Sequence, residues 1–257
     1  MAYREDKDLE FLGQMSSTDL NDLVDCLIKD KDGKLRLTEE LTTNEFYKNN
    51  HPNHTKYWQE IAAEIQCFGA NSLVTVLRRG KGVMYREVLS DVCDKAGVKY
   101  NKDAEIFKIE EGLLIKLLGD TLEKMSEVDR QEFVKIVGIT NLKAFTPAGL
   151  TAALQIAFKA GGFQSYQLTL MIANAVSRAL LGRGLALAAN ATLMRAASLL
   201  AGPVGWALTG GWTIADMAGP AFRVTLPSVI QVAVLRRKHI VEIEELKEKI
   251  RRGMGKN

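Results

Sequence analysis

Charged residues are missing from one long stretch of this chain, and acidic residues are scarce over a longer one. Ala196–Ala215 runs for twenty residues without an Asp, Glu, Lys or Arg, and it is rich in small side chains. Between Phe133 and Val241 the only acidic residue is Asp216, whereas ten lysines and arginines lie in the same span. A basic, apolar half of this kind is suited to an anionic or apolar partner. It indicates binding and not a reaction.

Cysteine and proline are also scarce, with three and five residues in the 257-residue chain. Cys26, Cys67 and Cys93 are an odd and widely spaced set, which indicates free thiols in a reducing compartment and no disulfide framework. The opening residues, M-A-Y-R-E-D-K-D, are hydrophilic and acidic, which argues against a cleaved secretory signal. We therefore expect a cytoplasmic protein, with peripheral association with the inner membrane as an option.

Motifs for catalysis and for metal or cofactor binding are lacking as well. Among only three histidines, His51 and His54 have a spacing at which two imidazoles can share a metal, but no third and fourth ligand accompany them. The turn Gly80-Lys81-Gly82 lacks the remaining residues of a phosphate-binding loop. No nucleophile with a matching base is present. The sequence predicts no cofactor, no metal and no enzymatic activity.

What is present in residues 1–140 is a series of short amphipathic segments with an acidic balance. Residues 1–132 hold 19 Lys and Arg against 26 Asp and Glu. Ser16 and Ser126 each precede an aspartate by three residues and then an apolar stripe, which predicts helix N-termini. No segment alternates with the period of a strand. We predict an all-α fold whose first domain, 1–140, is an acidic multi-helix bundle.

Residues 147–238 are apolar and basic, and glycine pairs divide them into helical segments. We predict a Gly/Ala-rich helical hairpin region here, with the sequence Gly202-Pro203 breaking the uncharged run. A charged C-terminal helix or tail, 239–257, is expected to follow as a separate element. Its residues Ile240, Ile243, Leu246 and Ile250 form a narrow apolar stripe that is short for a coiled coil.

The candidate membrane- or client-binding residues all lie in this second half. Its arginines can meet anionic headgroups, its glycines permit close packing, and its tryptophans suit an interface. A polar spot at Asp216 can either pair with an arginine or mark a membrane contact. The set is Arg178, Arg183, Arg195, Gly202, Gly205, Trp206, Gly210, Trp212, Asp216, Arg223, Arg236 and Arg237.

These features favour a non-enzymatic helical binding or chaperone-like protein. Its expected partner is an anionic membrane surface or an apolar protein helix. The main alternative is a membrane-perturbing, pore-forming effector with a soluble shielding half, and an enzyme of unknown type is third. The cations are dispersed without aromatic neighbours, which argues against nucleic acid. An ordinary hydrophobic core remains the structural alternative for the uncharged run.

A resemblance to a known family rests on four stretches. The chain reads W-Q-E-I-A-A-E-I-Q-C-F-G-A-N-S at 58–72, G-K-G-V-M-Y-R-E-V-L-S-D-V at 80–92, G-P-V-G-W-A-L-T-G at 202–210 and F-R-V-T-L-P-S-V-I-Q-V-A-V-L-R-R at 222–237. In these it resembles the YaaW-like family of uncharacterised bacterial proteins, with remote similarity to ubiquinol–cytochrome c chaperones. The opening Y-R-E-D-K-D-L-E-F-L resembles a short N-terminal module of such proteins. The resemblance implies a cytoplasmic, helical, chaperone-like protein near a membrane.

Overall fold

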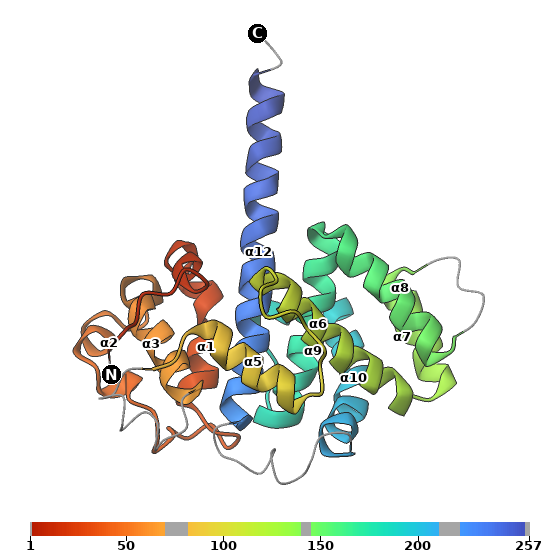
Figure 1. Ribbon diagram of the computed structural model, residues 1–257, viewed down its shortest axis with the longest axis horizontal. Coiled ribbons are helices and arrows are strands. Elements are labelled where there is room, and N and C mark those ends of the chain that lie inside the picture. Colours follow the sequence, from red (N-terminus) through yellow and green to blue (C-terminus); the bar gives the residue numbers. More distant parts are fainter. Residues whose placement is uncertain (1, 70–81, 140–144, 211–221, 255–257) are drawn as a thin grey trace.

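The computed structural model describes residues 2–69, 82–139, 145–210 and 222–254 (Figure 1). Within these ranges the chain forms α-helices and short 3-10 helices and no extended strand, and an isolated β-bridge joins Lys29 and Leu35. The predicted all-α fold is therefore confirmed. None of the helices in these ranges is both long and apolar enough to cross a bilayer.

The described residues form short 3-10 helices and longer α-helices. The 3-10 helices are η1 (Glu10–Gln14), η2 (Leu41–Thr43), η3 (His54–Tyr57) and η4 (Ala186–Ala188). The α-helices are α1 (Ser17–Ile28), α2 (Glu45–Asn50), α3 (Trp58–Gly69), α5 (Tyr85–Lys95), α6 (Ile106–Lys124), α7 (Glu127–Val137), α8 (Pro147–Ala160), α9 (Gly162–Leu181), α10 (Ala191–Gly210) and α12 (Phe222–Met254).

Local capping sets several of these boundaries, as the sequence predicts. The Ser16 and Ser126 hydroxyls accept hydrogen bonds from the backbone amides of Asp19 and Asp129, at the starts of α1 and α7. Thr146 caps α8 in the same way. Gly138 ends α7 in the left-handed region at φ 73°, which a side chain would disfavour. Each cap satisfies backbone groups that the helix itself leaves unpaired.

Helix α12 is the central element of the fold (Figure 1). Its first half packs against α1, α5, α6 and α9, and nearly every residue from Val224 to Arg237 is buried. One hydrophobic cluster extends from Leu9 to Leu235 and draws on both predicted domains. The segments 1–140 and 147–238 therefore share a core, because α12 returns into the bundle formed by the first half.

Helix α10 differs from the prediction at its proline. Gly202-Pro203 was expected to break the uncharged run, but Pro203 lies inside α10. A residue before proline is normally pushed out of the α conformation by a clash of its Cβ with the proline ring. Gly202 has no Cβ, and Leu200 and Val204 are buried on either side of the step. Packing of the buried face thus carries the helix through the proline.

The C-terminal segment also differs from the prediction. Residues 239–257 were expected to form a separate helix or tail, yet residues 239–254 continue α12 without interruption as part of its 33 residues. Figure 1 shows this second half projecting away from the other helices. No glycine or proline lies between Ser228 and Arg252, so nothing local ends the helix.

Candidate functional site

One side of α10 is exposed although the helix is mostly apolar. Arg195, Ser198, Gly202 and Trp206 lie on this side, at spacings of three or four residues that place them along one face. We call these four residues the α10 face. The opposite side of the helix carries Leu200, Val204 and other residues buried against α6 and α9. Trp206 is 72% exposed, which is unusual for so large an apolar side chain.

Glycines beside Trp206 leave space on this face. A Cβ built on Gly202 or Gly205 would meet no described atom within 4 Å. Gly202 has a local explanation, since it precedes Pro203. Gly205 has none of that kind: its φ is not positive, and it lies inside a helix, where glycine is disfavoured relative to alanine by about 1 kcal/mol. The structure therefore leaves room beside the Gly205 backbone on this part of α10.

Gly205→Ala should accordingly stabilise the free protein. The new methyl group enters open space and the unfolded chain loses conformational freedom, so the free energy of unfolding should rise by about 0.5–1 kcal/mol. Urea unfolding followed by circular dichroism measures the change. A loss of stability would mean that an unexpected neighbour already occupies the space beside Gly205.

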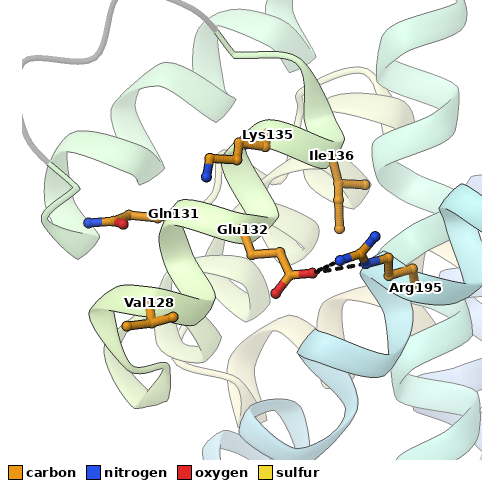
Figure 2. Close-up of a pocket in the computed structure, with 6 residues that line it drawn as sticks. All are labelled: Val128, Gln131, Glu132, Lys135, Ile136 and Arg195. Atoms are coloured by element: carbon orange, nitrogen blue, oxygen red, sulfur yellow. Dashed lines mark hydrogen bonds and ion pairs between the residues drawn. The ribbon is translucent and has the colours of Figure 1, made fainter.

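A groove opens between α7 and the start of the α10 face (Figure 2). Its volume is about 380 Å³, within the range of small-molecule and side-chain sites. In Figure 2, Glu132 from α7 and Arg195 from α10 point toward one another, and Nε of Arg195 lies 2.9 Å from Oε1 of Glu132. The lining residues are Val128, Gln131, Glu132, Lys135, Ile136 and Arg195.

The Glu132–Arg195 ion pair affects whether this groove favours an anionic or an apolar ligand. The Arg195 side chain is well exposed, so the pair contributes little to stability, on the order of 0–1 kcal/mol. It does offset the positive charge at this end of the α10 face. An anionic headgroup would have to compete with Glu132 for the guanidinium, whereas an apolar segment would not.

Three arginines expected at an anionic surface are instead bonded within the fold. Arg183 donates to the carbonyl oxygens of Asp25 and Asp30 at 2.8 Å each, where α1 ends. Arg236 forms an ion pair with Glu110 at 3.0 Å, and Arg237 one with Glu111 at 3.1 Å. The sequence placed these arginines at a surface, but long-range contacts that it does not reveal place Arg236 and Arg237 in the interior.

The remaining candidates are divided between the surface and the undescribed segment. Arg178 donates to the Ser198 hydroxyl at 3.3 Å, and Arg223 is exposed at the start of α12. Gly210 is the last residue of α10. Trp212 and Asp216 lie outside the described residues. The structure therefore brings together Arg195, Gly202, Gly205 and Trp206 on or beside one helix face, with Arg178 at its edge.

Comparison with known proteins assigns the chain to a family. It is 48% identical over 238 residues to a UPF0174 protein of Helicobacter pylori strain J99, covering 93% of this chain and 94% of that relative. It is 37% identical over 240 residues to the UPF0174 protein YaaW of Escherichia coli strain K12, covering 91% and 95%. The chain belongs to the UPF0174 family. The resemblance inferred from the sequence is confirmed.

Two family models divide this UPF0174 protein between them. Residues 53–230 match the model described as ubiquinol-cytochrome C chaperone, and residues 3–37 match a domain of unknown function, DUF3944. No solved structure matches the chain. The alignment to a chaperone family runs from the start of η3 into the first third of α12 and so includes the α10 face. A chaperone-like character is thus supported for the part of this UPF0174 protein that carries the candidate site.

The N-terminal module of the UPF0174 chain is held to the core by buried polar contacts. Oδ2 of Asp6 accepts a hydrogen bond from the Tyr85 amide at 2.6 Å, and the Asp8 carbonyl accepts one from Arg236 at 2.6 Å. The Tyr85 hydroxyl donates to Glu110 at 2.8 Å. Burial, together with the charge of Glu110, raises the pKa of that hydroxyl well above its ordinary value. These groups hold one another in place within the interior.

The histidines considered as metal ligands are engaged elsewhere. Nε2 of His54 lies 2.6 Å from Oδ1 of Asn21, and Nδ1 of His54 contacts the Tyr57 hydroxyl. Burial, with a smaller effect of His51, lowers the pKa of His54 to about 4. Within the described part of the chain, no three His, Cys, Asp or Glu side chains gather as metal ligands. His54 is a neutral, hydrogen-bonded side chain of the interior.

The cysteines of this UPF0174 protein are free thiols, as predicted. Cys26 and Cys93 are buried and Cys67 is partly buried. Burial raises the pKa of Cys26 and of Cys67 to about 11 and that of Cys93 to about 12. Since the thiolate is the reactive form, these side chains are poor nucleophiles at neutral pH.

Proposed function

We propose that this UPF0174 protein is a non-catalytic, chaperone-like protein that holds an apolar helix of a client protein against the α10 face. The proposal rests on one observation: the Trp206 side chain is 72% exposed and lies next to open space at Gly202 and Gly205. A large aromatic side chain anchors a partner, and glycines let its backbone approach closely. The match to a ubiquinol-cytochrome C chaperone family supports the same reading.

An apolar helix is favoured over an anionic membrane because of where the arginines lie. Binding to anionic lipid depends on cations that are available to headgroups. Arg183, Arg236 and Arg237 donate into the fold, and Arg195 pairs with Glu132. Apart from the paired Arg195, the α10 face offers the indole of Trp206, the hydroxyl of Ser198 and the bare backbone at Gly202, which supports an apolar helix as the partner.

The proposal also accounts for the groove beside the face. A helix laid along α10 from Trp206 toward Arg195 would reach the groove between α7 and α10. There Val128, an exposed apolar residue, and Ile136 can contact its side chains. In helix-in-groove recognition the bound helix presents anchors spaced by three or four residues, which can pack between the exposed residues of α10 and those of α7.

The proposal is tested with a labelled helical peptide of about 20 residues, leucine and alanine flanked by lysines. Fluorescence anisotropy measures its binding to the full chain. Trp206→Ala removes the anchor and Gly205→Leu fills the space, so each should weaken binding about tenfold or more. Ala152→Leu, an exposed substitution of equal bulk on α8, should leave binding unchanged.

Vesicles provide the opposing arms of the same experiment. If the protein floats with phosphatidylglycerol-containing vesicles but does not bind the peptide, its partner is a membrane surface and not a client helix. Release of trapped dye from those vesicles would favour the pore-forming alternative. If Gly205→Leu and Trp206→Ala both bind the peptide as strongly as the wild-type chain, the client binds elsewhere and the proposed role of the α10 face is wrong.

A further inference from the structure

The second half of α12 leaves the body of the molecule and extends alone (Figure 1). We call residues 239–254 the α12 tip. At 1.5 Å per residue it is about 24 Å long. At its base Lys238 bonds to Asp19 at 2.8 Å and to Glu242 at 2.7 Å, which fixes the direction in which the helix leaves. From Glu242 onward the described side chains are exposed, except for the partly covered Ile243.

The α12 tip carries an apolar stripe with nothing described packed against its outer part. Ile240, Ile243, Leu246 and Ile250 are spaced by three, three and four residues, so they lie on one side of the helix. Leu246 is 58% exposed and Ile250 is 50% exposed. An isolated helix of this length is only marginally stable in water. Burial of the stripe against a partner would both remove apolar surface from water and stabilise the helix.

Charge is distributed unevenly along the α12 tip, and this identifies the partner. Its first part carries Glu242, Glu244 and Glu245, and its second part carries Lys247, Lys249, Arg251 and Arg252 with a single Glu248. Two tips side by side in the same direction would place like charges together. Two tips in opposite directions place the acidic part of each beside the basic part of the other.

We propose that the α12 tip pairs in antiparallel fashion with the α12 tip of a second copy of this chain. In the register that sets Ile240 opposite Ile250, Ile243 lies opposite the aliphatic stem of Lys247. Glu244 of each copy then flanks Arg251 of the other, and the two Leu246 side chains meet across the seam. Every large apolar residue of the stripe acquires a partner, and the charges that border the seam are complementary.

An aromatic pair on α9 lies near the base of the α12 tip. Phe163, an exposed residue at the start of α9, contacts the Tyr166 ring with centroids 6.1 Å apart. Tyr166 in turn lies close enough to Lys238 and Glu242 to sense their charges. In the antiparallel pair, the far end of one tip reaches this base on the other copy. The interface is short, so we expect a dimer with a micromolar dissociation constant.

Sedimentation velocity of the full chain over a range of concentrations tests the pairing. The wild-type chain should shift from monomer to dimer, and a variant with Ile243→Ser, Leu246→Ser and Ile250→Ser should stay monomeric. Phe46→Ser, which alters an exposed apolar residue on α2, is the matched control and should dimerise normally. A chain that stays monomeric at about 100 µM, or a triple variant that still dimerises, overturns the proposal.

Charge reversal tests the direction of pairing. Glu244→Lys and Arg251→Glu should each weaken self-association about tenfold, because each sets like charges opposite each other. An equimolar mixture of the two variants should dimerise again, since the two introduced charges then face each other with opposite signs and the second pair keeps its native charges. A mixture that remains monomeric contradicts the antiparallel register. If the wild-type chain is monomeric and the triple serine variant no longer binds the helical peptide, the proposal of pairing is wrong and the apolar stripe binds a client instead.

Discussion

Replacing Arg236 with methionine is expected to lower the free energy of unfolding by about 3–5 kcal/mol, the range for breaking one side of a buried ion pair. Arg236 is 9% exposed, and its guanidinium pairs with Glu110 and donates to the Asp8 carbonyl. It also lies over the Phe11 ring, 4.5 Å from the centroid. Methionine restores much of the volume but leaves the Glu110 carboxylate buried without its cation. Urea unfolding followed by circular dichroism measures the loss.

Two controls separate the buried charge from a general effect of losing arginine. Arg252→Met removes an ion pair with Glu248 on the exposed end of the same helix, and it should change stability by less than about 0.5 kcal/mol. Adding Glu110→Gln to Arg236→Met replaces the stranded carboxylate by a neutral amide and should recover most of the loss. If the double variant is as unstable as Arg236→Met alone, the loss comes from packing on Phe11 and not from the unpaired charge.

The local features of this fold follow from sequence because they depend on neighbouring residues. Ser16 and Ser126 begin helices because their hydroxyls accept from an amide three residues on. The α10 face includes another local feature, since Gly202 and Trp206 stand out in an uncharged run. By contrast, the joining of Arg236 to Glu110 spans 126 residues of chain, and no local pattern selects that acid among the many in the first half.

Two of the predictions that the structure overturned have a common physical origin. A helix break at Pro203 and a boundary at residue 239 were both predicted from local sequence preferences. Pro203 lies inside α10, which buried packing keeps intact, and residue 239 lies inside α12, where no helix-breaking residue follows until Gly253. The basic cluster that includes Arg236 and Arg237 looked like a surface feature because charges are rarely buried. The apolar run that directly precedes Arg236 and Arg237 is the sequence feature that could have indicated their burial, because it continues the same buried helix.

A second large effect is expected at Glu64, which the sequence did not distinguish from other acids. This α3 residue is 2% exposed, and its carboxylate accepts from the Glu40 amide at 3.2 and 3.3 Å. Burial, with the charges of Glu39 and Glu40, raises its pKa from 4.5 to about 8. The folded protein therefore binds this proton more tightly than the unfolded chain. Its contribution to stability is largest below pH 4.5 and is lost as the pH rises toward 8.

Glu64→Gln should remove this dependence, because the amide is neutral at every pH. We expect the variant to match the wild-type chain near pH 4.5 and to exceed its free energy of unfolding by roughly 2–4 kcal/mol at pH 8. His54 acts in the opposite sense, since its lowered pKa removes stability as the pH falls from 6.5 toward 4. That effect is common to both proteins and cancels in the difference between their unfolding curves.

The difference between the two pH profiles is the quantity to measure, by urea unfolding at half-unit steps of pH. Glu123→Gln, an exposed substitution on α6, serves as the control and should run parallel to the wild-type profile. Parallel profiles for Glu64→Gln would show that Glu64 ionises as it does in the unfolded chain. A widening gap from pH 4.5 to pH 8 would identify Glu64 as an acid that the folded chain keeps protonated at neutral pH, because burial outweighs its backbone hydrogen bonds.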